Sequence, residues 1–469
     1  MSDLIPRRKA LSSLLTGTVV AASAGRLYAN ENAEIIPSTP SAPAYVYLTW
    51  QHDPCTTMTV SFQSLDPRNL KGELRYWLDE STHPRIDLAP PDAREVSTQA
   101  HQIPGLSDGR WVHHVELTEL TPGVRYACQV RVAGSDWTCA YRFQPLPNDD
   151  TPLRFVVGGD IGARTAHERN PGERDPLHNQ AALRDPHFAL IGGDLAYANG
   201  KLSNIDDWDS LLTAWKQHFL APGRRLIPMI LAIGNHEVDG GYDGTPETAP
   251  FFYGFFAQAG RVAHFTRRLG PRLALVVLDS GHTATHSAQT DWLDEQLTAL
   301  RDTPHVMAMY HIPLYPSIRS FGGSRSERGR EEWGPLFDRH NVEVAFENHD
   351  HALKRTHSLR DGRIVPSGEG TLYLGDGALG RGARPQPKDA AERTYLARAA
   401  SIQHFWLVEE KEGELIYQAI DAAGRIVDSY PTVHADAEAN FDRWAEEADA
   451  FARRENAAKR AAWDAGLGW

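Results

Sequence analysis

The chain has 469 residues, enough for two or three domains. It carries 48 basic against 61 acidic residues, a net charge of −13, which argues against general binding to nucleic acid or to anionic membranes. Three cysteines, Cys55, Cys128 and Cys139, exclude a disulfide-rich scaffold. Cys128 and Cys139 either pair across neighbouring strands or remain buried thiols.

The first 29 residues have the pattern of an export signal. Arg7 and Arg8 precede an apolar stretch over residues 11–22, which is too short to span a bilayer as a helix. The adjacent arginines favour the twin-arginine route to a periplasmic or extracellular location. A general secretory signal or an uncleaved anchor is the alternative. A linker follows over residues 30–43, and we expect no membrane span once the signal is removed.

Short strands separated by turn signals fill residues 44–146. Residues 57–62 alternate strictly, with Met58, Val60 and Phe62 on one face. The other expected strands cover residues 45–50, 113–117, 125–132 and 139–143. Because no helical period interrupts them, this region is predicted to be an all-β sandwich.

Apolar runs recur between residues 147 and 430, and each ends in small or polar residues. They cover residues 153–157, 188–191, 226–233, 273–278, 306–310 and 342–346. A helical stretch is expected between them at residues 289–300. Since open α/β sheets bind ligands at the carboxyl ends of their strands, this pattern predicts an α/β domain with its site at the strand ends.

The tail, residues 431–469, is predicted to form a C-terminal helix centred on residues 435–464. Phe441, Trp444, Ala448 and Phe451 fall on one face of that helix. We expect this face to pack on the body of the protein, with a partner helix as the alternative.

The polar residues that end the runs form an ordered set of ligand types. The set comprises Asp160, Asp194, Tyr197, Asn235, His236, His311, His349 and His351. Taken singly, each of these residues is most often a turn residue or a solvated side chain. Their occurrence as an ordered set, each after an apolar run, is hard to explain by chance. Two cations about 3.5–4 Å apart can clamp a phosphoryl group and activate a water. A carboxylate shared between them offsets their repulsion, and Asp194 is the candidate.

These motifs resemble the metallophosphoesterases and, within them, the purple acid phosphatases, over about residues 44–430. Leu120, Pro122 and Tyr126 resemble a fibronectin type III pattern, with Tyr126 as a corner tyrosine. The wider superfamily has Asp-x-His in its first motif, whereas this chain has Asp160-Ile161-Gly162. Purple acid phosphatases carry a tyrosine three residues after the second aspartate, as in Asp194-Leu195-Ala196-Tyr197.

The resemblance implies a dinuclear metal site at the strand ends. The first metal would be bound by Asp160, Asp194, Tyr197 and His351. The second would be bound by Asp194, Asn235, His311 and His349. A phenolate suits a ferric ion, so the expected pair is iron with iron, zinc or manganese. His236 resembles the family's phosphate-contacting histidine and is the expected catalytic residue.

Two departures from the family pattern stand out. Asn348 occupies the glycine position before His349-Asp350-His351, where we expect it to be tolerated because asparagine can adopt left-handed backbone conformations. Residues 312–330 hold no histidine. This Gly/Ser-rich stretch is expected to be a loop, either solvated and flexible or in contact with substrate. Its candidate side chains are Tyr315, Arg319, Arg325, Arg328 and Arg330.

The sequence thus predicts an exported hydrolase with an N-terminal β-sandwich and an α/β metallophosphoesterase domain. It would cleave phosphate monoesters or phosphoanhydrides of small molecules by attack of a metal-bound hydroxide. A phosphodiesterase on the same scaffold is one alternative. The other is an envelope binding protein with a relic site. The pattern does not indicate an oligomeric state.

Overall fold

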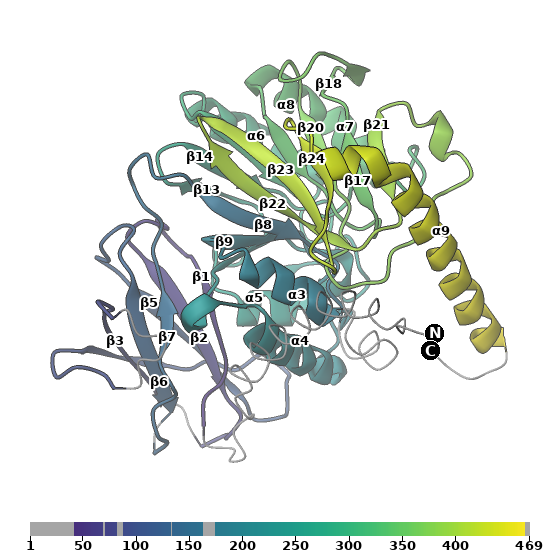
Figure 1. Cartoon of the computed structure of the whole chain (residues 1–469). Coiled ribbons are helices and arrows are strands. Elements are labelled where there is room, and N and C mark those ends of the chain that lie inside the picture. The colour runs from purple at the N-terminus through teal and green to yellow at the C-terminus, as the bar shows by residue number, and fades with distance from the viewer. Residues whose placement is uncertain (1–41, 69–70, 82–87, 133, 163–173, 465–469) are drawn as a thin grey trace, which may run out of the picture.

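The computed structural model describes residues 42–68, 71–81, 88–132, 134–162 and 174–464. The expected export segment, residues 1–29, and most of the linker after it lie outside these ranges. Figure 1 shows a smaller β-sheet domain beside a larger α/β part, with a long C-terminal helix along one side. Within the described ranges, no helix has the length and apolar character needed to cross a membrane.

The N-terminal domain has two antiparallel layers, which confirms the predicted sandwich. One layer contains β1 (Ala44–Thr49), β2 (Met58–Ser64) and β5 (Trp111–Leu117). The other contains β4 (Arg94–Gln99), β3 (Lys71–Leu78), β6 (Tyr126–Val132) and β7 (Tyr141–Phe143). The Tyr126 hydroxyl accepts a hydrogen bond from the Thr121 N–H at 3.0 Å, the contact that defines a tyrosine corner.

Cys128 and Cys139 are not joined by a disulfide. Cys128 pairs in register with Tyr141 of β7, so Cys139 lies before that strand begins. The Cys139 sulfur is instead contacted by the guanidinium of Arg224. The thiol alternative is therefore the one the structure adopts.

The second layer of the sandwich continues into the following part of the chain. β11 (Arg225–Leu226) pairs in parallel with β7 through Arg225 and Arg142, and β10 (Leu220–Ala221) pairs with β11. The Arg142 guanidinium donates to Asp79 Oδ2 at 2.7 Å and to the Gly223 carbonyl at 2.5 Å. The two domains are thus connected by a shared sheet.

The α/β part contains two mixed sheets that pack face to face. The first orders β12 (Met229–Leu231), β9 (Phe188–Ile191), β8 (Arg154–Gly158), β22 (His404–Lys411), β23 (Glu414–Asp421) and β24 (Ile426–Tyr430). The second orders β13 (Phe265–Leu269), β14 (Leu273–Val277), β15 (His305–Met309), β16 (Val344–Phe346), β20 (Leu372–Gly375), β17 (Leu353–Thr356) and β21 (Leu396–Ala400). A two-stranded sheet joins β18 (Leu359–Arg360) to β19 (Arg363–Ile364).

One continuous core lies between these sheets. Phe155 of β8 stacks on Phe188 of β9 and meets Phe346 of β16 edge-on, with ring centres 4.8 and 6.4 Å apart. β8, β9 and β12 run parallel to one another, and so do β14, β15 and β16. Each of the six predicted apolar runs overlaps one of these strands, and the carboxyl ends of the strands meet at one edge of the core.

Helices cover the outer faces of both sheets. α3 (Arg174–Leu183), α4 (Ile205–His218) and α5 (Pro250–Phe255) cover the first. α6 (His286–Ala299), α7 (Ser324–Glu332) and α8 (Gly334–His340) cover the second. Gln289 of α6 accepts from the Asp279 N–H at 2.9 Å and donates to the Asp279 carbonyl at 2.7 Å, so it docks this helix onto the end of β14.

The C-terminal helix α9 (Ala435–Asp464) packs against β24 and β21. Phe441 and Trp444 are buried against the main core, whereas Phe451 is 51% exposed. The predicted apolar face is therefore covered in its first half and open in its second.

A fully buried ion cluster lies behind the strand ends of the second sheet. The Lys354 ammonium contacts a carboxylate oxygen of Glu347, lies 3.1 Å from Asp376 Oδ2 and donates to the Tyr315 carbonyl at 3.0 Å. All three charged side chains have 0% exposure. Burial opposes the charge on Lys354, but the two carboxylates outweigh it and raise its pKa above the ordinary value. The cluster fixes Glu347, which comes directly before the Asn348-His349-Asp350-His351 segment.

We expect Lys354→Met to lower the free energy of unfolding by about 3–5 kcal/mol, because it leaves two buried carboxylates without their cation. Lys388→Met, which removes an exposed ammonium, serves as the control and should change stability by no more than about 0.5 kcal/mol. Urea denaturation of both variants measures the difference. Equal stability of the two variants would contradict the role given to Lys354.

Candidate metal centre

All eight side chains of the predicted site lie at the ends of strands that meet between the two sheets. Asp160 follows β8, Asp194 and Tyr197 follow β9, and Asn235 and His236 follow β12. His311 follows β15, while His349 and His351 follow β16. Both sheets therefore contribute to a single cluster of donor atoms.

One half of the cluster is formed by Asp160, Tyr197 and His351. Asp160 Oδ1 lies 3.1 Å from the Tyr197 hydroxyl oxygen and 3.0 Å from His351 Nε2. The same hydroxyl oxygen is 3.0 Å from His351 Nε2. Three potential ligand atoms from two sheets are thus in mutual contact.

The other half is formed around His311. His311 Nε2 lies 3.2 Å from Asp194 Oδ2, 3.2 Å from Asn235 Oδ1 and 3.0 Å from His349 Nδ1. Its Nδ1 faces the Gly192 carbonyl at 2.8 Å, which places the proton on Nδ1 and leaves Nε2 for a metal. The two halves are connected because the His349 N–H donates to Asp160 Oδ2 at 2.8 Å.

The buried carboxylates of Asp160 and Asp194 require positive charge nearby. Asp160 is 0% exposed and Asp194 is 1% exposed. Burial opposes ionisation of Asp194, but His311 outweighs it, so the pKa of Asp194 is held well below its usual range. Burial would also lower the pKa of His311, but Asp194 and Asp160 reverse this and raise it to about 9. A set of carboxylate, phenol, amide and imidazole donors with this charge balance fits a pair of transition-metal cations.

Five of the predicted ligands have left-handed backbone conformations. The φ angles are 53° at Asp160, 52° at Asp194, 61° at Tyr197, 78° at His349 and 55° at His351. These values turn the chain back immediately after each strand, so that the side chains point at one another. Aspartate and histidine enter this region more readily than most residues, which helps explain the residue types at four of the five positions.

Asn348 does not behave as the sequence suggested, because it is not among the left-handed residues. Its side-chain amide instead donates to the Tyr310 carbonyl at 3.1 Å and lies against two glycines. A Cβ atom at Gly192 would be 1.7 Å from Asn348 Nδ2, and one at Gly159 would be 2.4 Å from Asn348 Oδ1. The two Gly-Gly-Asp motifs therefore make room for the asparagine amide.

Glu237 was not assigned a role from the sequence, although it follows Asn235-His236 directly. It is 1% exposed and accepts the N–H groups of Asp194, Leu195 and Gly234 at 2.7, 2.8 and 2.9 Å. Burial, with a further contribution from Asp194, raises the pKa of Glu237 to about 8. Glu237 ties the turn after β9 to the turn after β12 and so positions Asp194.

His236 lies at the outer edge of the cluster, with its side chain 33% exposed. Its N–H donates to Asp194 Oδ1 at 2.8 Å, and its ring stacks on Tyr197 with centres 4.0 Å apart. Its Nδ1 pairs with Asn199 Oδ1, a contact that the sequence did not indicate. His236 Nε2, 3.8 Å from Asp194 Oδ2, is left for a ligand at the mouth of the site.

The segment over residues 312–330 is more ordered and less available than predicted. Residues 324–332 form helix α7 rather than a flexible loop. Tyr315 is 7% exposed and packs against Tyr373 and Tyr395, with burial raising its pKa to about 12. Arg319 pairs with Asp350 at 2.9 Å and donates to the His349 carbonyl.

Two further arginines of this segment are also held by the protein. Arg325 pairs with Asp243 at 2.8 Å, and Arg330 donates to the carbonyls of Leu314 and Phe321. Of the four arginines in this segment, only Arg328 is exposed. Arg319, Arg325 and Arg330, which were expected to be available to substrate, therefore stabilise the segment through contacts within the protein.

Two family descriptions match the two parts of the chain. Residues 43–144 match "Purple acid Phosphatase, N-terminal domain", and residues 153–353 match "Calcineurin-like phosphoesterase". These ranges contain the sandwich strands and all eight site residues, respectively.

Curated relatives include several plant proteins. The chain is 23% identical over 386 residues to "Purple acid phosphatase" of Glycine max, covering 76% of this chain and 78% of that protein. It is 23% identical over 377 residues to "Purple acid phosphatase 5" of Arabidopsis thaliana, covering 76% of this chain and 86% of that one.

Solved structures show the same fold. The purple acid phosphatase PPD1 of yellow lupin (Lupinus luteus) superposes with a TM-score of 0.68 at 19% identity, over 84% of this chain and 74% of that one. A structure of PhoD superposes with a TM-score of 0.61 at 12% identity, over 89% of this chain and 99% of that one. From these matches, together with the Asp/His cluster at the strand ends, the chain combines a purple acid phosphatase N-terminal domain with a calcineurin-like phosphoesterase domain and is a distant homologue of the purple acid phosphatases.

Proposed function

We propose that the chain is a two-metal hydrolase of phosphate monoesters or phosphoanhydrides. The observation that carries this proposal is the meeting of two donor groups, one around Asp160 and one around His311, at a single strand-end edge. Asp160, Tyr197 and His351 would hold one ion, and Asn235, His311 and His349 the other. Asp194 would bridge them. Bound there, two ions would supply an activated water and stabilise charge on the phosphoryl oxygens.

The residues at the mouth of this site have a binding role in the proposal. His236 is fixed by its stacking on Tyr197 and by Asn199, so its exposed Nε2 is held ready for a phosphoryl oxygen. Asn199 Oδ1 can only accept, so His236 Nδ1 carries a proton, and Nε2 donates to a phosphoryl oxygen when the ring is protonated at both nitrogens. A preorganised donor of this kind stabilises developing charge without reorganising during the reaction. The family membership supports a phosphoester substrate but leaves the reaction to be measured.

Phosphodiester hydrolysis remains the second candidate, because the described part of residues 312–330 offers no proton donor to the site. Tyr315, the residue that could have supplied one, is buried away in an aromatic cluster. Without a proton donor, a strongly basic alkoxide is a poor leaving group, whereas an aryl oxide or a phosphate leaves easily.

The first test concerns the metal content. We expect about two ions per wild-type chain, and Asp194→Ala should lose both together because it removes the shared ligand. Asp302→Ala, at a 92% exposed position, should keep both. Elemental analysis measures this. A fully loaded Asp194→Ala variant would refute the bridging assignment, and a metal-free wild type would favour the binding-protein alternative.

The second test concerns Tyr197 as a ligand. If the ion beside it is ferric, the oxidised protein should have a visible phenolate charge-transfer band, and Tyr197→Phe should lose that band. Absorption spectra of iron-loaded protein measure this. A colourless wild type that contains ferric iron would remove Tyr197 from the ligand set.

The third test concerns substrate class. Because residues 312–330 contain no histidine and Tyr315 is buried, glycerol phosphate should be cleaved more slowly than aryl phosphates and pyrophosphate, by a factor up to about 10²–10⁴. A comparison of kcat/KM across these substrates, together with a bis-aryl phosphate diester, measures this preference. Equal values for glycerol phosphate and aryl phosphate would reveal another acid, and faster cleavage of the diester than of the aryl monoester would favour the phosphodiesterase.

A further inference from the structure

Residues 379–384, here called the arginine segment, run directly over the metal centre. The Leu379 N–H donates to the Gly159 carbonyl at 3.0 Å, and the Arg381 N–H donates to the Asp160 carbonyl at 2.8 Å. At its other end, the Arg384 N–H donates to the His351 carbonyl at 2.8 Å. The backbone of the segment is therefore bonded to two of the predicted ligands.

Arg381 lies across the tyrosine of the site. Its guanidinium carbon is 4.3 Å from the centre of the Tyr197 ring, which also stacks on His236. Its stem crosses Gly162, where an added Cβ would be 2.5 Å from Arg381 Cδ. Gly162 is the position at which the wider superfamily carries a histidine, so the space left there is occupied by Arg381.

Arg384 approaches the same centre from the side of His351. Its N–H donates to the His351 carbonyl, and its side chain is half-buried. A charged group in a half-buried place is unfavourable unless an ion of opposite charge joins it.

Unlike Arg319 and Arg325, Arg381 and Arg384 have no carboxylate partner in the part of the chain that the structure describes. Arg319 pairs with Asp350 and Arg325 with Asp243. Among the residues that the structure describes, no carboxylate lies within ion-pair distance of Arg381 or Arg384. Their charge is therefore available to a ligand.

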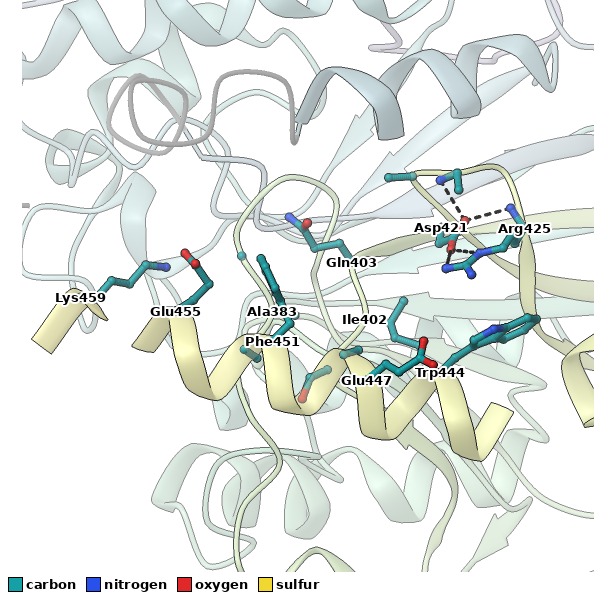
Figure 2. A pocket seen from close by; sticks show the side chains of 16 residues that line it. Ala383, Ile402, Gln403, Asp421, Arg425, Trp444, Glu447, Phe451, Glu455 and Lys459 are labelled. Carbon is teal, nitrogen blue, oxygen red and sulfur yellow. Dashed lines mark hydrogen bonds and ion pairs between the residues drawn. The ribbon is translucent and has the colours of Figure 1, made fainter. Parts of the chain in front are cut away.

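The segment is also supported from behind, so its arginines are held in place. Gln403 donates to the carbonyls of Gly380 and Arg381 at 3.2 and 3.1 Å. Ala383 and Gln403 also line a cavity of about 410 Å³ together with Phe451 and Glu455 of α9. These four side chains are labelled in Figure 2.

Helix α9 adds a second anchor just beyond the segment. Asp449 accepts the Gln386 N–H at 2.6 Å and the Ser401 hydroxyl at 3.1 Å. Arg453 donates to the Gln386 carbonyl at 2.8 Å. The chain that carries Arg384 is therefore fixed to the helix as well as to His351.

We propose that Arg381 and Arg384 bind a second anionic group of the substrate, so that the preferred substrate is a phosphoanhydride or a phosphoester whose leaving group carries its own phosphate. This inference rests on the proposed function, since it places one phosphoryl group at the metal ligands and the second at the arginine segment. Guanidinium forks match phosphate oxygens in pairs, which a single histidine cannot do.

The reaction on such a substrate is balanced. The oxygen of a water molecule forms a bond to the phosphorus at the metal ligands, and the bond from that phosphorus to the bridging oxygen breaks. The bridging oxygen leaves with the electron pair on the second phosphate. The two protons of the water are shared between the products and solvent. Arg381 and Arg384 stabilise the charge that collects on the departing phosphate.

The test compares substrates with one and two phosphates in four variants. We expect Arg381→Gln and Arg384→Gln each to lower kcat/KM for pyrophosphate about 10- to 100-fold. The same variants should lower kcat/KM for an aryl phosphate by a clearly smaller factor than for pyrophosphate. Arg381→Lys, which keeps the charge but loses the fork, should recover only part of the loss. Arg301→Gln, at a 74% exposed position, is the matched control for net charge.

Calorimetry provides a readout that does not depend on turnover. Methylenediphosphonate, which keeps two anionic groups but is not hydrolysed, should bind the wild type more tightly than orthophosphate does, and the difference should disappear in the Arg381→Gln/Arg384→Gln double variant. Metal content and thermal midpoint should match those of the wild type, which separates a binding role from a merely structural one.

The outcomes distinguish the two proposals. Normal pyrophosphate cleavage and normal methylenediphosphonate binding in the double variant would overturn the assignment of the arginines, while the hydrolase itself would stand. Absence of hydrolysis of any phosphoester by metal-loaded wild type would overturn the proposed function. In that case a difference in methylenediphosphonate affinity between wild type and double variant would still support the arginine site, and its absence would refute it.

Discussion

The site depends on a backbone constraint, the reversal of the chain at the end of each ligand-bearing strand. Five ligand positions have φ between 52° and 78°, a region that costs a non-glycine residue about 1–2 kcal/mol. Such conformations persist only where the surroundings fix them. Here the turns after β8 and β9 are bonded together, since the N–H groups of Asp160, Ile161 and Gly162 donate to the carbonyls of Gly193, Asp194 and Leu195 at 3.0, 3.0 and 2.9 Å. Glu237 then binds the second turn to the third, so the strain is shared by a connected set of loops.

Much of the fold and nearly all of the metal centre could be predicted because their signals are local. Each ligand directly follows an apolar run, and a parallel strand brings its carboxyl end to a known edge of the sheet. β3 was not predicted, although its sequence alternates in the way typical of a half-buried strand. Leu74 and Tyr76 are buried, and Glu73 and Arg75 are partly exposed. By contrast, α7 had no apolar signal to find, because Ser324–Glu332 contains no hydrophobic side chain and buries only Ser326 and Gly329.

The features that escaped prediction depend on contacts between distant segments. Asn348 was expected to matter for its own backbone, yet its importance lies in the space left by Gly159 and Gly192 on two other strands. Similarly, positive charge was expected beside His311 in the chain, whereas the structure brings Arg381 and Arg384 of residues 379–384 to the site. A second example is Gly162. The space left by its missing side chain is occupied by Arg381, whose guanidinium lies over the Tyr197 ring. Spacing along one sequence cannot show which residue enters a gap formed elsewhere.

The sheet that β7 and β11 share has a consequence for how such a protein can change in evolution. If the sandwich were exchanged for an unrelated module by recombination near residue 147, β11 would lose its neighbour and present an unpaired edge, which invites association with other chains. Arg225 would lose its pairing with Arg142 at the same time. The sandwich and the α/β part are therefore expected to be inherited together. Insertions and deletions should accumulate in loops away from the pairing of β7 with β11.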